Sequence, residues 1–159
     1  MTRYIKQRDT FSCVPVTILN ARKWLGHRVS YGRDYRECRA RSGCHPGYGA
    51  NGTGFRQATR DLPVTRMYQP SLEKIDDAVK AGHAIILRAR WPDRTGIAGH
   101  IFLITRRTDR SLFCINVYGG HVWRHKSLFT YHYLTKVPGA PAAWIVRKPD
   151  KHGTDQHLY

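Results

Sequence analysis

Cys13 lies at the start of an amphipathic segment, in the stretch QRDTFSCVPVTILNARKWLG at residues 7–26. The thiol follows Gln7 by six residues and precedes apolar side chains at helical spacing. Backbone amides at the first turn of a helix can lower the pKa of a thiol from ~8.5 to ~3.5–7.5, which favours the nucleophilic thiolate. The position therefore suits either a thiol that attacks a carbonyl carbon or a small buried hydrophobic residue.

A nucleophilic thiol needs a general base within hydrogen-bonding reach and a third polar group that fixes the base. The best candidates are His100, which follows a glycine-rich loop, and Asn116, which lies on the next predicted strand across a short hairpin. With Cys13, they can meet where the helices join the sheet. The alternative bases are His121, the most serious because it follows Asn116 closely, and His27, His83, His125 and His132.

Helices in the first half of the chain and strands in the second half must position these residues. The spacing of apolar residues and the capping residues predict helices over 12–26, 35–41, 53–62 and 71–82. Short runs rich in Ile, Leu, Val and Phe predict antiparallel strands over 84–90, 100–107, 111–120 and 142–148. N-terminal helices packed on an antiparallel sheet define an α+β domain.

Length and composition indicate a globular protein with one core. The chain has 159 residues, 41% of them hydrophobic, and no apolar run reaches the ~20 residues of a membrane-spanning helix. We expect one domain over 1–149 and a flexible tail over 150–159. The first ten residues lack the apolar segment of a secretion signal, so we expect free thiols in a reducing cytoplasm.

The charge of the chain is strongly positive. Its 27 Lys and Arg residues against 11 Asp and Glu give a formal charge of +16. Such a charge attracts acidic protein segments, anionic surfaces or nucleic acid. The basic residues are scattered along the chain, which indicates a diffuse positive surface. The charge therefore predicts a class of partner but does not predict a reaction.

Three motifs resemble those of papain-like cysteine peptidases: Q-x5-C before a helix, GHIFLI at 99–104 and INVYGG at 115–120. The similarity is greatest to C39-like, bacteriocin-processing-type peptidase domains and spans most of residues 4–120. It implies a papain-like fold that needs no cofactor, with Cys13 as the nucleophile, His100 as the base and Asn116 as the residue that orients the base. It also implies that the Gln7 side chain and the backbone amide of Cys13 form an oxyanion hole.

Two positions depart from the C39-like pattern. Val14 follows the cysteine, where many of these domains have glycine, which implies a more crowded helix start or a narrower cleft. Asn116 takes the place of their usual aspartate, as in papain itself, and still suits an orienting role. We also expect Trp91, Gly99 and Trp123 to contribute to the substrate cleft, because they flank His100 and Asn116 or the loops next to them.

Other clusters of reactive side chains have simpler explanations. Cys38, Cys44 and His45 lack the second ligand pair of a zinc finger, so we expect no metal. Asp76 and Asp77 are adjacent on a predicted helix and cannot face each other, so we expect a solvated surface and not an acid/base pair.

The predicted function is a thiol peptidase that cleaves peptide or isopeptide bonds, acting as a monomer on a protein or peptide substrate. The positive charge favours an acidic substrate. Two alternatives remain. The first is a papain-fold amidase, deamidase or transferase acting on glutamine side chains, which would use the same residues. The second is a non-catalytic basic module that binds nucleic acid through its charge.

Overall fold

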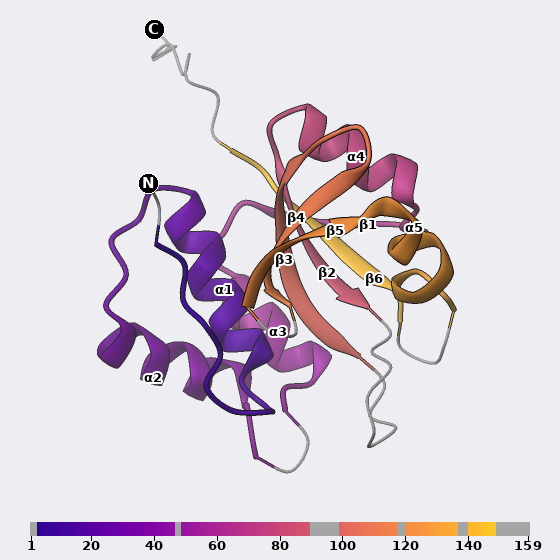
Figure 1. The fold of residues 1–159 in the computed structure, drawn as a ribbon. Helices are drawn as coiled ribbons and strands as arrows, with labels where there is room; N and C mark the ends of the chain where they lie inside the picture. The colour runs from indigo at the N-terminus through magenta and orange to yellow at the C-terminus, as the bar shows by residue number, and fades with distance from the viewer. Residues whose placement is uncertain (1–2, 47–48, 90–98, 118–119, 137–139, 149–159) are drawn as a thin grey trace, which may run out of the picture.

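One six-stranded sheet with helices on both faces forms the fold (Figure 1). The computed structural model describes residues 3–46, 49–89, 99–117, 120–136 and 140–148. The strands follow the order β1-β6-β2-β3-β4-β5 across the sheet, and each neighbouring pair is antiparallel. This arrangement confirms the predicted α+β class.

The bounds of most elements agree with the prediction to within four residues. The helices are α1 (Cys13–Trp24), α2 (Tyr31–Ser42), α3 (Gly52–Thr59), α4 (Leu72–Lys80) and α5 (Lys126–Leu128), and a π-helical turn follows at Phe129–Tyr133. The strands are β1 (Val64–Met67), β2 (Ala84–Ala89), β3 (His100–Arg107), β4 (Ser111–Val117), β5 (Gly120–His125) and β6 (Ala142–Val146).

The sequence pattern did not predict β1, β5 or the helical turns at 126–133. Both strands lie at the edges of the sheet. Apart from the buried Met67, their residues are partly buried or exposed, and neither strand forms a long apolar run. Their sequences, VTRM and GHVWRH, therefore carry a weak hydrophobic signal. The predicted tail over 150–159 lies outside the described residues.

The sheet has a hydrophobic core on each face. Ile86 and Leu103 pack toward α1, whereas Ile85 and Phe102 pack toward α4 and the π-helical turn. Successive side chains of a strand point to opposite faces, so a central strand that is covered on both sides is apolar throughout. Figure 1 shows α1, α2 and α3 on one side of the sheet and α4 and α5 on the other. The first of these layers brings the Cys13 helix against the strands.

Helices α2 and α3 meet at Gly54, where only a glycine fits. A Cβ atom built on Gly54 would overlap the backbone carbonyl of Ser42. The Oδ1 atom of Asn51 caps α3 by accepting the Gly54 amide at 2.8 Å. The cap and the missing side chain together let α3 lie directly on α2.

The prediction that Asp76 lies on a solvated surface was wrong. Its Oδ1 atom accepts a hydrogen bond from Nε of Arg107 at 2.8 Å and lies 2.7 Å from Nζ of Lys126. Burial acts to raise the pKa of Asp76, but the two cations outweigh it and hold the pKa below its usual range. These ion pairs connect α4 to β3 and α5. Among the described residues, no helix has the length and apolar character to span a membrane.

Candidate active site

The N-terminal segment that carries Gln7 is held against α1 by Asn20. Asn20 is fully buried in the helix. Its side chain accepts a hydrogen bond from the Ile5 amide at 2.7 Å and donates one to the Ile5 carbonyl at 2.9 Å. Because one side chain satisfies both backbone groups of Ile5, the path of the chain is fixed two residues before Gln7.

Asp9 organises the turn between Gln7 and α1. Its Oδ1 atom accepts hydrogen bonds from the amides of Phe11 at 3.0 Å and Ser12 at 2.7 Å. Its backbone carbonyl accepts one from Nε2 of Gln7 at 2.6 Å. Ser12 occupies the N-cap position but makes no side-chain cap bond, so the carboxylate of Asp9 organises the entry to the helix. Cys13 is the first residue of α1.

Cys13 is a partly exposed residue, and its thiol lies close to the backbone of β3. One turn further along α1, the buried Thr17 hydroxyl donates to the Ile101 carbonyl at 3.0 Å, which ties the helix to the residue after His100. Burial raises the pKa of the Cys13 thiol, and the amides of Ile101, Val14 and Cys13 itself offset only part of that effect. The sequence had suggested that the helix start lowers the pKa of this thiol. In the structure the pKa is instead raised above its ordinary value.

His100 is the first residue of β3, and its ring is fixed by Asn116. The Nε2 atom of His100 lies 2.6 Å from the backbone carbonyl oxygen of Asn116. A carbonyl can only accept a hydrogen bond, so Nε2 carries the hydrogen and the neutral ring has its lone pair on Nδ1. Burial lowers the pKa of His100, and the Asn116 carbonyl opposes this in part. The ring is therefore neutral at pH 7 and can accept a proton.

Asn116 is buried and has a φ of 66°, within an irregular part of the β4–β5 pairing. Its Oδ1 atom accepts the Gln7 backbone amide at 3.0 Å, and its Nδ2 atom donates to Oε1 of Gln7 at 3.1 Å. The side chain of Asn116 thus binds Gln7, while its backbone carbonyl contacts His100. This division of contacts differs from the expectation that the side-chain amide orients the imidazole.

His121 also contacts Asn116, through the backbone amide of that residue. Its Nδ1 atom accepts the backbone amide of Asn116 at 3.1 Å. Burial lowers the pKa of His121, the Tyr4 backbone raises it and the charge of Lys6 lowers it. The sequence marked His121 only as an alternative base. Its proximity to Asn116 was indicated by the intervening YGG, since a glycine pair favours a tight return of the chain.

The structure describes two of the three residues expected in the substrate cleft, Gly99 and Trp123. Trp91 lies outside the described residues. Gly99 directly precedes His100 and has a φ of 112°, a conformation that side chains rarely adopt. Trp123 is 44% exposed on β5, with its ring centroid 5.3 Å from that of Phe113 and the guanidinium of Arg106 over it.

All four cysteines are free thiols, and only Cys13 is partly exposed. Burial raises the pKa of Cys38 to about 12 and that of Cys44 to about 11, and it also raises the pKa of Cys114. Within the described part of the chain, no three His, Cys, Asp or Glu residues group together as metal ligands. Cys13 is therefore the best placed of the four to react.

The chain has the fold of C39-type peptidase domains. It matches the peptidase domain of Streptococcus ComA, a bifunctional ABC transporter of a quorum-sensing pathway, with a TM-score of 0.67 and 14% identity over 93% of this chain and 100% of that one. The chain also matches a double-glycine motif protease from an AMS/PCAT transporter, solved in complex with the leader peptide. The TM-score is 0.67, with 13% identity over 93% of each chain.

A Bacillus anthracis protein assigned as a C39-like peptidase gives a TM-score of 0.62 and 14% identity over 92% of this chain and 95% of that one. No protein-family model and no curated protein sequence matches the chain. At these identities the solved structures establish the fold, and the activity has to be argued from the residues of this chain.

Proposed function

We propose that this protein is a cysteine peptidase that cleaves peptide or isopeptide bonds with Cys13 as its nucleophile. The observation that carries the proposal is the chain of hydrogen bonds from Gln7 through Asn116 to His100. These bonds lie beside the start of α1, which carries Cys13, the only one of the four cysteines that is a partly exposed residue. The C39-type fold supports the same chemistry.

In the proposed reaction, Nδ1 of His100 takes the proton of the Cys13 thiol as the sulfur attacks the substrate carbonyl. A thiol with a raised pKa and a neutral imidazole suit a proton transfer that accompanies the attack. The Asn116 carbonyl keeps its hydrogen bond to Nε2 and stabilises the imidazolium that forms. His100 then protonates the leaving amine, and water releases the acyl group from sulfur.

Gln7 is proposed to donate to the oxyanion together with the backbone amide of Cys13. The amide group of Gln7 is fixed at both ends, because Asn116 donates to its Oε1 and the Asp9 carbonyl accepts one hydrogen of its Nε2. The Nε2 atom has a second hydrogen, which can point toward a substrate oxygen. A donor that is already oriented stabilises developing charge without reorganisation.

We propose a protein or peptide substrate and a monomeric enzyme in a reducing, cytoplasmic setting. Free thiols at all four cysteines suit a reducing compartment, and the charge of +16 favours acidic segments. The related AMS/PCAT protease was solved with a peptide ligand, which supports a peptide substrate for this fold. Amidase, deamidase or transferase chemistry on glutamine side chains is the alternative that uses the same residues.

Incubation with a proteome-derived peptide library, followed by mass spectrometry of new N-termini, tests the proposal. We expect new N-termini with the parent protein and with the control Cys114→Ser, and none with Cys13→Ser. Equal cleavage by Cys13→Ser would exclude the proposed nucleophile. Conversion of glutamine to glutamate without chain cleavage would instead identify a deamidase.

A further inference from the structure

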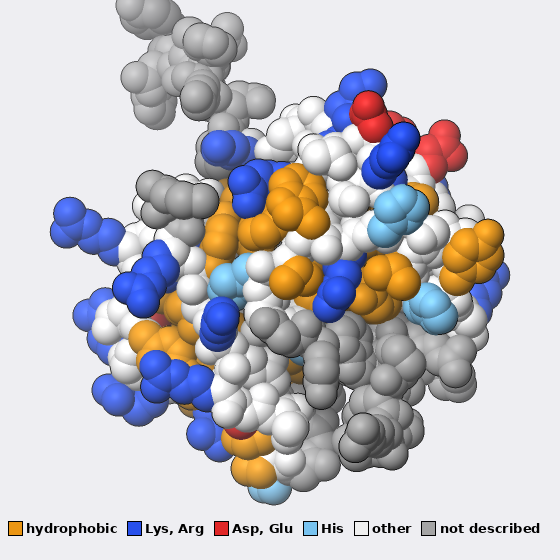
Figure 2. Space-filling model, in the orientation of Figure 1, with side chains coloured by type: hydrophobic (Ala, Val, Ile, Leu, Met, Phe, Trp, Pro, Cys, Tyr) orange, Lys and Arg blue, Asp and Glu red, His pale blue; other side chains and the backbone are white. Residues whose placement is uncertain are grey.

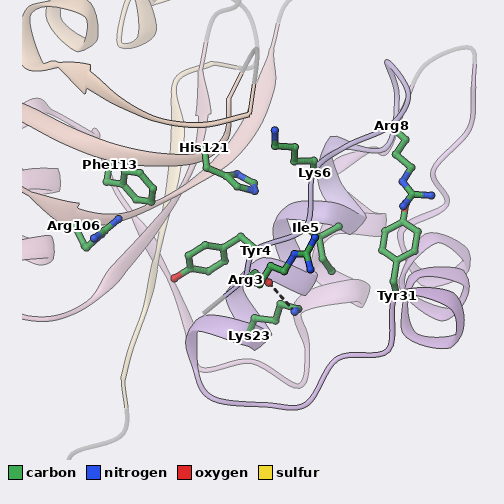
Figure 3. Close-up of a pocket in the computed structure, with 10 residues that line it drawn as sticks. All are labelled: Arg3, Tyr4, Ile5, Lys6, Arg8, Lys23, Tyr31, Arg106, Phe113 and His121. Carbon is green, nitrogen blue, oxygen red and sulfur yellow. Dashed lines mark hydrogen bonds between the residues drawn. The ribbon is translucent and has the colours of Figure 1, made fainter. Parts of the chain in front are cut away.

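A cavity of about 1000 Å³ lies beside the candidate active site (Figure 3). Its wall is formed by the N-terminal segment, helices α1 and α2 and strands β3, β4 and β5. His121, whose Nδ1 atom accepts the Asn116 amide, is part of its wall. The volume is at the upper end of the roughly 300–1,000 Å³ typical of small-molecule sites, so the cavity has room for an extended ligand.

Among the residues that the structure describes, the cavity is lined by five cations and by no acidic residue. Elsewhere in the molecule arginines pair with carboxylates, as Arg41 does with Asp61 and Arg107 with Asp76. Within the described residues, none of the five cations of the cavity forms an ion pair. They are Arg3, Lys6, Arg8, Lys23 and Arg106. Their charge therefore attracts an anion into a concave site.

Aromatic rings alternate with these cations. The guanidinium of Arg106 lies 4.1 Å from the ring centroid of Phe113, and that of Arg8 lies 5.0 Å from the ring centroid of Tyr31. Figure 3 shows these two pairs at opposite ends of the cavity, with Tyr4 and Lys6 between them. On this face of the molecule, basic and apolar side chains lie next to one another (Figure 2).

Flat guanidinium and aromatic groups bind nucleic-acid bases by stacking, while neighbouring cations bind the phosphates. An acidic peptide would pair with the cations through its carboxylates alone, whereas a nucleotide can pair its phosphate with a cation and also stack its base on an arginine–aromatic pair. We propose that this cavity binds single-stranded nucleic acid, with phosphates on the five cations and bases against the rings and guanidinium planes. This binding does not depend on the thiol chemistry proposed above, so Cys13→Ser should bind equally well.

Fluorescence anisotropy with labelled ten-nucleotide oligo(dT) and oligo(U) measures the binding across a series of salt concentrations. Each phosphate contact on a single strand contributes a slope of about −0.7 to log K against log salt, so five contacts predict a slope of about −3.5. The cavity variant Arg3→Gln/Lys6→Gln/Arg106→Gln should bind at least ~10-fold more weakly and have a slope shallower by about 2.

A matched control lowers the net charge equally on exposed residues outside the cavity: Arg60→Gln/Arg66→Gln/Lys80→Gln. It should change the affinity by less than ~2-fold, since these residues do not line the cavity and salt screens exposed charges that make no direct contact with the ligand. Equal losses in the two triple variants would show that only the overall charge matters and would overturn the site. Thermal melts of each variant establish that both triple variants are folded.

Two further measurements identify the ligand class. The Tyr31 ring stacks on Tyr35 and lies under the Arg8 guanidinium. Tyr31→Leu keeps the charge but removes this support of the Arg8 plane, and should weaken oligonucleotide binding by ~5-fold or more, since the loss of a stacking platform costs about 1–3 kcal/mol per base. A ten-residue polyglutamate peptide should compete poorly at the same salt concentration. Equal affinity for polyglutamate, with no effect of Tyr31→Leu, would assign the cavity to acidic peptides and contradict the proposal.

Discussion

The Nε2 atom of His100 lies 2.6 Å from the backbone carbonyl oxygen of Asn116, a residue with a φ of 66°. Apart from glycine, asparagine is among the residues that adopt this left-handed conformation most readily. Its side chain remains available for two hydrogen bonds with Gln7. A single residue therefore joins the proposed base to the proposed oxyanion donor, although Gln7 is 109 residues away in the sequence.

We predict that the Asn116 side chain affects catalysis through Gln7. Asn116→Gly tolerates the positive φ and keeps the carbonyl that contacts His100, but it removes both bonds to Gln7. Gln7→Ala should lower kcat by ~100- to 1000-fold, and Asn116→Gly by ~10-fold or more. In the double variant the losses should be clearly less than multiplicative, because both substitutions remove the same function. Kinetics on a cleaved library peptide measure this, and fully multiplicative losses would contradict the coupling.

We predict that His121 positions Asn116 and does not act as a base. His121→Leu removes the acceptor of the Asn116 amide and should lower kcat by ~2- to 10-fold, the effect of one lost hydrogen bond. His121→Asn places an oxygen near the position of Nδ1 and should restore most of the rate. If His121 were the base, both His121→Leu and His121→Asn would be inactive, because asparagine cannot accept a proton and could not restore kcat.

The pH dependence should reflect a neutral base with a lowered pKa. The proposed reaction needs neutral His100, so kcat/KM should stay high as the pH falls through ~6.5, the ordinary histidine value, and should decline only below it. The same acid limb should persist in His121→Asn, which tests the assignment to His100. An acid limb at or above pH ~6.5 would contradict this account.

A comparison of two glycines in α3 tests the helix packing that supports the Cys13 helix. Gly54→Ala places a Cβ atom against the Ser42 carbonyl and should lower the free energy of unfolding by about 1–3 kcal/mol or more. Gly52→Ala, in the same helix, meets no atom within 4 Å and should be neutral or slightly stabilising. Urea denaturation of both variants gives the difference. Equal stabilities would show that α2 and α3 do not pack as closely as described.

The sequence could predict the parts of the fold that depend on local patterns. The apolar spacing after Ser12 predicted the Cys13 helix, and the run HIFLITRR predicted β3 with its observed bounds. The edge strand β5 could not be recognised, because its burial depends on the position of a neighbouring strand. The ion pairs of Asp76 depend in the same way on elements distant in sequence.

The contacts within the candidate site were less predictable than its residues. Residue type and order proposed Gln7, Cys13, His100 and Asn116 as candidates, but the contact between the Asn116 carbonyl and His100 depends on the positive φ of Asn116. The direction of the Cys13 pKa depends on burial by the sheet, which outweighs the local effect of the helix amides. Both features arise from tertiary structure and leave no pattern in the sequence.

The central claim is that Cys13 is a nucleophile whose base is His100. Labelling by a peptidyl electrophile at pH 7, with mass spectrometry of all four cysteines, tests it most directly. We predict modification of Cys13 before Cys38, Cys44 or Cys114, and a rate that falls by ~100-fold or more in His100→Ala, the typical contribution of a general base. Modification of another cysteine first, or an unchanged rate in His100→Ala, would contradict the claim.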